Sequence, residues 1–203
     1  MMAVWFFITF SAFGDASDVF MTNGITAEHN GDLAGALTNF DKAIELAPSD
    51  GFIYMMRGTV KKEKGDLDGA ISDLDAAVKF EPDFFGAYNN RGVMKRAKLD
   101  FDGALADYNK AIELKPDYAN AYFNRGVVKK DKGDLDGALR DLNKSIELNP
   151  QLGEPYYSRG VIKRTKGDLA GSNADFKKAI ELNPKMLGFI KTNGYSLSVT
   201  NSN

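Results

Sequence analysis

The chain has 203 residues, with 26 Lys and Arg against 28 Asp and Glu, and a formal net charge of -2. A hydrophobic content of 43% is typical of a folded chain, and the charge balance gives no electrostatic argument for nucleic-acid binding. The absence of cysteine excludes disulfides, thiolate metal sites and cysteine nucleophiles. His29 is the only histidine, so a catalytic triad or a multi-histidine metal site would have to be formed around this one residue. The composition favours a binding or scaffolding protein over an enzyme, and no cofactor or metal is expected.

The first segment, residues 1–16, is dominated by an uncharged apolar run at 2–13. This run is shorter than the roughly 20 residues that cross a membrane as a helix. It resembles the hydrophobic region of a secretory signal, with a small-x-small cleavage site at 12–14, although no basic residue precedes it. The alternative is an apolar segment that packs on the helices that follow. The chain is therefore expected in the cytoplasm, or secreted or periplasmic, according to which interpretation holds.

From residue 17 onward, residues that break or bend helices recur at a spacing of 34. Five of the six prolines keep this spacing: Pro48, Pro82, Pro116, Pro150 and Pro184. Three series of glycines keep it as well, with Leu99 as the one break. A fixed period of this length predicts a tandem repeat. The predicted repeats are 17–50, 51–84, 85–118, 119–152 and 153–186. Residues 187–203 are expected to form a short cap and a polar tail.

Each repeat is predicted to hold two helices, which in the third repeat cover 86–98 and 102–114. In most repeats Gly-Asp lies between them, as at Gly65 and Asp66. Glycine suits a left-handed turn after the first helix, and aspartate suits the N-cap of the second. A glycine in the middle of a helix costs about 1 kcal/mol against alanine. Its recurrence, as at Gly58, therefore predicts a close crossing of the two helices.

One repeat carries a full set of spaced small and large residues: Tyr122, Gly126, Gly133, Ala138, Leu142, Ser145 and Pro150. This pattern resembles the tetratricopeptide repeat over residues 17–186. The resemblance implies an all-α fold, a right-handed superhelical solenoid of five antiparallel helix pairs. It also implies a concave groove lined by the first helix of each pair.

Arginines depart from that pattern, because they stand before the mid-helix glycines where the family often has leucine. They are Arg57, Arg91, Arg125 and Arg159. Aspartates also recur at one equivalent site in the second helix of four repeats, at Asp73, Asp107, Asp141 and Asp175. We expect these aspartates to pair with the repeat arginines rather than to act in catalysis, and no catalytic residue is predicted.

Transferring the groove positions of the family predicts a set of partner-binding residues: Phe52, Met55, Lys62, Asn89, Asn90, Arg96, Asn120, Phe123, Asn124, Lys130, Tyr157 and Arg164. Asn90 and Asn124 are equivalent, and such amides hold an extended peptide by its backbone; the alternative is a pair of solvated side chains. The basic residues suit an acidic or phosphorylated segment, or are cations favoured at helix ends. The apolar members mark an interaction surface or extend the packing between helices.

The resulting hypothesis is a non-catalytic scaffold that binds a peptide segment or a protein partner in the concave groove. The alternative is a module that assembles with copies of itself through weakly capped ends. Nucleic acid is not an expected partner. A chaperone C-terminal tail is not expected either, because only one of the five clamp positions fits; these positions are Met21, Ile25, Met56, Gly86 and Asn90.

Overall fold

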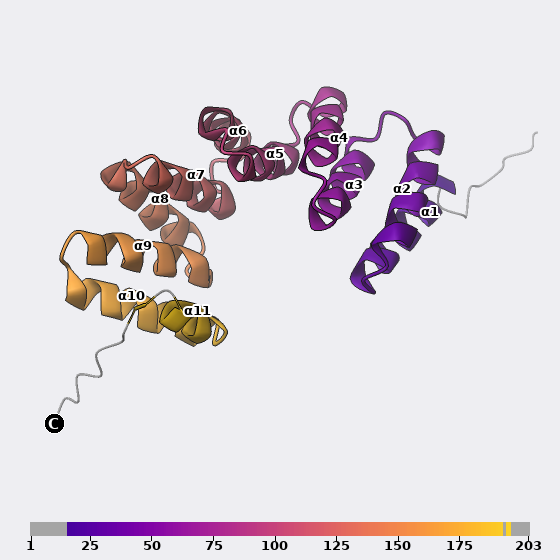
Figure 1. The fold of residues 1–203 in the computed structure, drawn as a ribbon. Helices are drawn as coiled ribbons and strands as arrows, with labels where there is room; N and C mark the ends of the chain where they lie inside the picture. Colours follow the sequence, from indigo (N-terminus) through magenta and orange to yellow (C-terminus); the bar gives the residue numbers. More distant parts are fainter. Residues whose placement is uncertain (1–15, 193, 196–203) are drawn as a thin grey trace, which may run out of the picture. The chain divides into compact units, whose positions relative to one another are not determined.

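A computed structural model of the chain describes residues 16–192, 194 and 195. These residues form eleven α-helices, numbered in chain order in Figure 1, and no strand is present among them. The predicted all-α class is thereby confirmed. The candidate signal at 1–14 lies outside the described residues. Within the part of the chain that the structure describes, no helix is both long and apolar enough to cross a membrane.

The helices divide into two compact units, Met1–Pro82 and Asp83–Asn203. In the first unit α1 packs on α2, α2 on α3, and α3 on α4. The bounds are α1 Ala16–His29, α2 Leu33–Leu46, α3 Gly51–Glu63 and α4 Leu67–Phe80. Each of the first two predicted repeats thus holds one pair of helices.

The second unit holds three further pairs and a short last helix (Figure 1). The bounds are α5 Phe85–Ala97, α6 Phe101–Leu114, α7 Ala119–Asp131, α8 Leu135–Leu148, α9 Gly153–Thr165, α10 Leu169–Leu182 and α11 Met186–Thr192. Within this unit each odd-numbered helix from α5 to α9 packs on the helix that follows it.

The turn within each pair follows the predicted chemistry. Gly65 has φ +81°, which glycine adopts without strain. The Asp66 carboxylate then accepts a hydrogen bond from the Gly69 amide at 2.9 Å and caps α4. A Cβ at Gly69 would collide with this carboxylate, which explains the third series of glycines. Leu99, the break in the pattern, has φ 64° and takes the same left-handed conformation.

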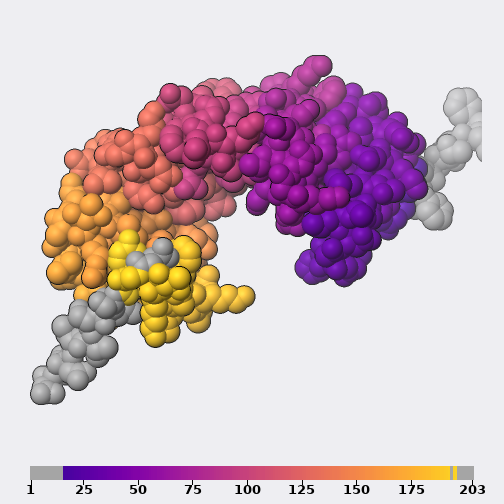
Figure 2. All heavy atoms as spheres, viewed as in Figure 1, coloured from indigo at the N-terminus to yellow at the C-terminus, as the bar shows by residue number. Residues whose placement is uncertain are grey.

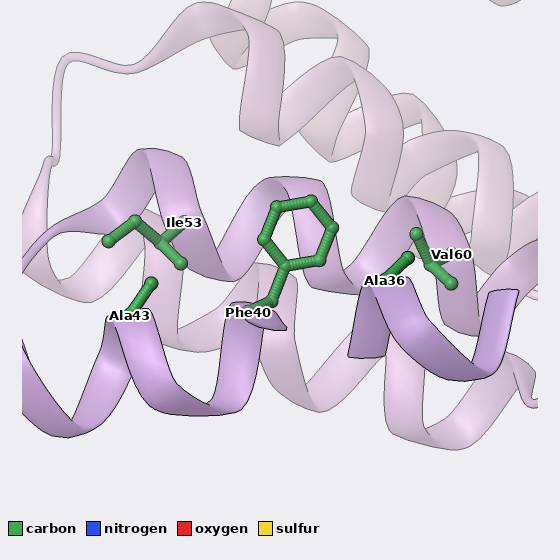
Figure 3. Close-up of a cluster of buried hydrophobic side chains, with 5 residues drawn as sticks. All are labelled: Ala36, Phe40, Ala43, Ile53 and Val60. Carbon is green, nitrogen blue, oxygen red and sulfur yellow. The ribbon is translucent and has the colours of Figure 1, made fainter. Parts of the chain in front are cut away.

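The core of the first unit lies between α2 and α3, as Figure 3 shows. Its buried members are Ala36, Phe40, Ala43, Ile53 and Val60. Helix α1 packs closely on Phe40 at Gly24, because glycine has no side chain there. A Cβ added at Gly24 would lie 2.7 Å from the Phe40 ring. Gly92 stands in the same relation to the Tyr108 ring in the second unit. The predicted close crossings are therefore present, and they explain why glycine recurs in the middle of a helix.

The chain after the fifth pair continues the repeat register for one short helix. Ile190 in α11 follows Tyr156 by 34 residues and is fully buried. The ring of Tyr195 packs 5.2 Å from that of Phe176 in α10, centroid to centroid. In Figure 2 the yellow atoms of this segment lie against the orange atoms of the preceding helices. Phe189 remains 52% exposed beside them.

Candidate functional site

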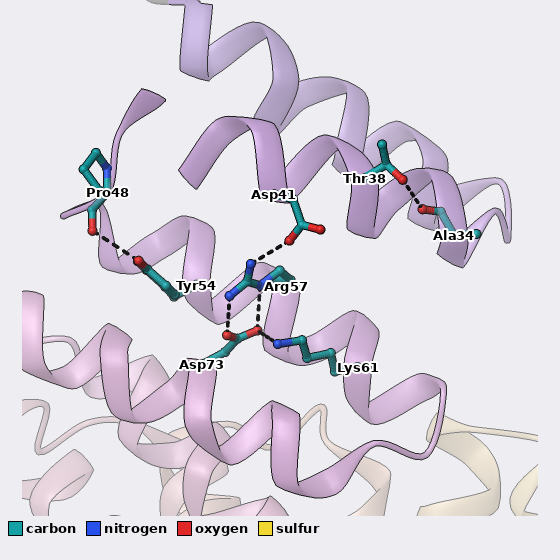
Figure 4. Close-up of polar contacts among 8 residues, drawn as sticks. All are labelled: Ala34, Thr38, Asp41, Pro48, Tyr54, Arg57, Lys61 and Asp73. Atoms are coloured by element: carbon teal, nitrogen blue, oxygen red, sulfur yellow. Dashed lines mark hydrogen bonds and ion pairs between the residues drawn. The ribbon is translucent and has the colours of Figure 1, made fainter. Parts of the chain in front are cut away.

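Clusters of charged residues fix the first helix of a repeat against two second helices. In the first unit the Arg57 guanidinium donates to both carboxylate oxygens of Asp73, at 2.9 and 2.6 Å, and to Asp41 at 2.6 Å (Figure 4). Lys61 reaches the same Asp73 carboxylate at 2.8 Å. The hydrogen bond with Asp73 is the main cause that raises the pKa of Arg57. The predicted pairing of arginine with aspartate is confirmed.

The same arrangement orients α7 and α9 in the second unit. Arg125 binds Asp141 through two nitrogens and also reaches Asn109 in α6 at 2.7 Å. Arg159 repeats these contacts with Asp175 and Asn143. Residues two apart on a helix point to opposite faces. Fixing an arginine on one face of α7 or α9 therefore leaves the other face to line a site.

A cavity of about 500 Å³ lies between α7, α9 and α11. Its lining is Phe123, Val127, Lys130, Glu154, Tyr157, Ser158, Asn183, Lys185, Met186 and Phe189. The lining residues of α7 are three or four positions apart, as are Glu154 and Tyr157 of α9, so each set shares one helical face. The Tyr157 and Phe189 rings meet edge to face, with centroids 5.2 Å apart. This cavity brings together three of the predicted residues: Phe123, Lys130 and Tyr157.

The cavity has a neutral aromatic wall and a cationic edge. Burial is the larger cause that raises the pKa of the Tyr157 phenol, and the neighbouring Tyr195 adds to it. Lys130 lies 3.5 Å from Asp131. Arg96 holds the same carboxylate more closely, with two hydrogen bonds at 2.9 and 2.8 Å. Lys130 is therefore the less neutralised of the two cations.

Three asparagines form a chain of hydrogen bonds between α5 and α7. The Asn124 Nδ2 donates to Asn89 Oδ1 at 2.9 Å, and the Asn89 Nδ2 donates to Asn90 Oδ1 at 3.4 Å. Asn89 is only 5% exposed. This differs from the expectation that Asn89 is open to a partner, because its amide is held between its two neighbours. Asn90 and Asn124, the two outer members of this hydrogen-bonded row, are half-buried.

Two more predicted residues of the second unit lie apart from this cavity. Asn120 lines a separate polar cavity of about 250 Å³ with Lys115 and Asn149 among its neighbours. Arg164 lies over the Tyr195 ring, 5.6 Å from its centroid.

The first unit holds the remaining predicted residues. Phe52 and Lys62 are exposed, and Met55 is half-buried. Met56 packs against the core cluster, which agrees with the packing alternative.

The sequence interpretation missed the part of the cavity that comes from the end of the array. The sequence places Met186 at the end of the fifth repeat and Phe189 in the cap, and its periodicity gives no role to Lys185. The register of Ile190 was the signal that could have found them, because it marks α11 as the start of another first helix. Within the described residues no group of three or more His, Asp or Glu is placed to hold a metal ion.

Sequence models of the tetratricopeptide repeat match most of the array. One described as "TPR repeat" matches residues 94–133, and two described as "Tetratricopeptide repeat" match 119–152 and, in two places, 53–84 and 153–186. The chain belongs to the tetratricopeptide repeat family. A comparison with curated protein sequences gives no match.

Solved structures of tetratricopeptide repeat (TPR) proteins share the fold. A MamA crystal structure is 25% identical, with a TM-score of 0.69 over 87% of this chain and 97% of that one. TTC0263, a thermophilic TPR protein from Thermus thermophilus, is 22% identical, with a TM-score of 0.73 over 88% and 97%. YrrB, described as a TPR protein with an unusual peptide-binding site, is 23% identical, with a TM-score of 0.64 over 88% and 93%. The predicted TPR solenoid is confirmed, and family membership supports a protein-interaction scaffold in general.

Proposed function

We propose that this TPR protein is a non-catalytic scaffold that binds a peptide segment on the faces of α5, α7 and α9 in its second unit. The observation that carries the proposal is the apolar cavity between α7, α9 and α11. Concave, mostly apolar sites with a few polar groups are the usual form of a ligand site. TPR arrays typically serve as interaction scaffolds, which supports a role without catalysis.

The amide chain beside the cavity suits the backbone of an extended peptide. Among the residues that the structure describes, Asn124 Oδ1 and Asn90 Nδ2 have no hydrogen-bond partner. One is an acceptor and the other a donor, so the pair matches the N–H and C=O groups of a peptide. Lys130 and Arg164 add positive charge on α7 and α9. An acidic segment therefore fits this surface better than a basic one.

The test is a cross-linked pull-down from the native extract. The parent chain is compared with a variant carrying Asn90→Ala, Asn124→Ala and Lys130→Glu. A matched control carries Ser72→Ala and Lys177→Glu at exposed sites on α4 and α10. We expect the parent and the control to capture the same partner and the site variant to lose it, with unchanged circular dichroism. A partner that survives all three changes would show that these helix faces are not the binding site.

A second candidate function is assembly with copies of itself through the ends of the array. It is favoured by apolar side chains left exposed on the terminal helices, with Val19 on α1 at 53% and Phe189 on α11 at 52%. Light scattering over a concentration series tests it. A mass that stays monomeric up to about 0.5 mM, a concentration at which contacts of millimolar affinity already show, contradicts this candidate.

A further inference from the structure

The cavity is distinguished from the rest of the helix faces by α11, which supplies one of its walls. Met186 and Phe189 stand there beside Tyr157. We infer that the cavity holds a bulky apolar side chain of a bound segment, and that a carboxylate next to that side chain pairs with Lys130. This inference rests on the proposed function and gives the chemistry of the partner.

The size and the walls of the cavity suit such a side chain. A volume of about 500 Å³ lies within the range of small-ligand sites, which is roughly 300–1,000 Å³. Phe123, Tyr157 and Phe189 offer ring edges and faces to another ring. Met186 is flexible and polarisable, so it adapts to side chains of different shape.

The charges around the cavity favour an acidic neighbour for the apolar side chain. Two of the lining residues are cations, Lys130 and Lys185, and one is an anion, Glu154. The Asp131 carboxylate, 3.5 Å from Lys130, is already held by two shorter hydrogen bonds from Arg96. A carboxylate of the partner therefore gains a charge-assisted contact with Lys130 at little loss to the existing pair.

Side chains other than Phe189 also hold the wall formed by α11 in place. Ile190 anchors the helix as a fully buried side chain. Tyr195 contacts Phe176 from beyond the end of the helix. Phe189 is 52% exposed, and we expect Ile190 and Tyr195 to keep the helix anchored when the Phe189 ring is removed. A change at this residue is therefore a selective test of the cavity.

The test measures the fluorescence anisotropy of three labelled peptides with the full chain. The first is Gly-Ser-Glu-Phe-Glu-Ser-Gly, the second replaces Phe with Ala, and the third replaces both Glu with Lys. We expect the first to bind about ten-fold more tightly than the second, as burial of a phenyl ring implies. It should bind about three-fold more tightly than the third at low salt, and this preference should fade as salt screens the charges.

Variants assign the two effects to the two sides of the cavity. Phe189→Ala or Met186→Ala should reduce the preference for Phe over Ala, and Lys130→Ala should remove the preference for Glu over Lys. Leu169→Ala is the matched control, because Leu169 is 55% exposed on α10 and lies outside the lining. All variants should keep the circular dichroism of the parent.

Two results would overturn the inference and leave the proposed function standing. In the first, the pull-down captures a partner that the site variant loses, but none of the three peptides binds. In the second, the Phe peptide binds and neither Phe189→Ala nor Met186→Ala changes its affinity. A partner that the site variant in the pull-down still captures would instead contradict the proposed function.

Discussion

The two helix pairs of the first unit differ in how they are joined. In the α3–α4 pair, Arg57 and Lys61 on the first helix both contact Asp73 on the second. The Asp73 side chain is only 4% exposed. The equivalent positions in the α1–α2 pair are neutral and are Asn23, Ala27 and Asn39.

The neutral pair is held by apolar packing and by a close helix crossing. Asn39 bonds within its own helix, to the Gly35 carbonyl at 2.8 Å. Phe40 fills the space beside Gly24, and Phe20 and Met21 pack on the same cluster. Apolar periodicity is therefore enough to pair two helices of this repeat. The charged cluster adds a fixed orientation of the first helix, because a bidentate pair restricts geometry more than apolar contact does.

The largest expected effect comes from removing the shared carboxylate. Asp73→Ala leaves Arg57 and Lys61 facing a buried site without their anion, and we expect a loss of about 3 kcal/mol. Asn39→Ala at the equivalent position should cost less than about 1 kcal/mol, because it removes one neutral hydrogen bond. Urea unfolding gives the free energies, and hydrogen exchange of the α3–α4 amides locates the loss. Equal losses in the two variants would contradict the distinction.

A smaller effect is expected from building the cluster into the first pair. The triple change Asn23→Arg, Ala27→Lys and Asn39→Asp places the three charges at equivalent positions. We expect a gain of about 1 kcal/mol, because exposed and half-exposed ion pairs contribute little. Hydrogen exchange of α1 amides should slow in the variant. A control with Asn23→Arg and Ala27→Lys alone should show no gain, and a gain there would point to a cause other than the pairing.

The smallest effect concerns the contact of α1 with α3. The pKa of Glu28 is raised above its usual 4.5, first by burial and then by the Glu63 carboxylate, while His29 opposes the shift. A raised pKa means that protonation of Glu28 favours the folded state. This contribution is present below pH 4.5 and is lost as the pH rises through the folded-state pKa.

Glu28→Gln should therefore stabilise the chain at about pH 7 and have no effect at about pH 3.5. We expect only a few tenths of a kcal/mol, because the side chain is only half-buried and solvent screens its charge. Thermal unfolding at the two pH values measures this difference. Glu45→Gln, at an exposed site on α2, is the control. The same gain at both pH values would show that the charge of Glu28 is not the cause.

Features that recur in most repeats could be predicted from the sequence. The turn at Gly65, the cap at Asp66 and the crossing at Gly92 each depend on neighbours at fixed spacing within one repeat. The pairing of Arg125 with Asp141 could be predicted for the same reason. Once the period is known, one repeat defines the local geometry of the others.

Features that depend on side-chain choice or on the end of the array could not be predicted. Asn89 and Asn90 are adjacent in the sequence, and their side-chain rotamers determine which of them hydrogen-bonds to Asn124. The pairing of Arg96 with Asp131 involves a residue outside the groove pattern. Phe189 lies beyond the last full repeat, where the periodicity stops. Its position in the cavity wall therefore could not be predicted from an equivalent residue in another repeat.

The contacts of Arg159 have a consequence for changes in the number of repeats. Its partner in the preceding repeat is Asn143, and Asn109 is the partner of Arg125 in the same geometry. Excision of residues 119–152 would bring Asn109 opposite Arg159 and restore the same pair of residues at the new junction. Loss of this repeat therefore leaves the hydrogen bond between Arg159 and an asparagine of the preceding repeat available at the new junction.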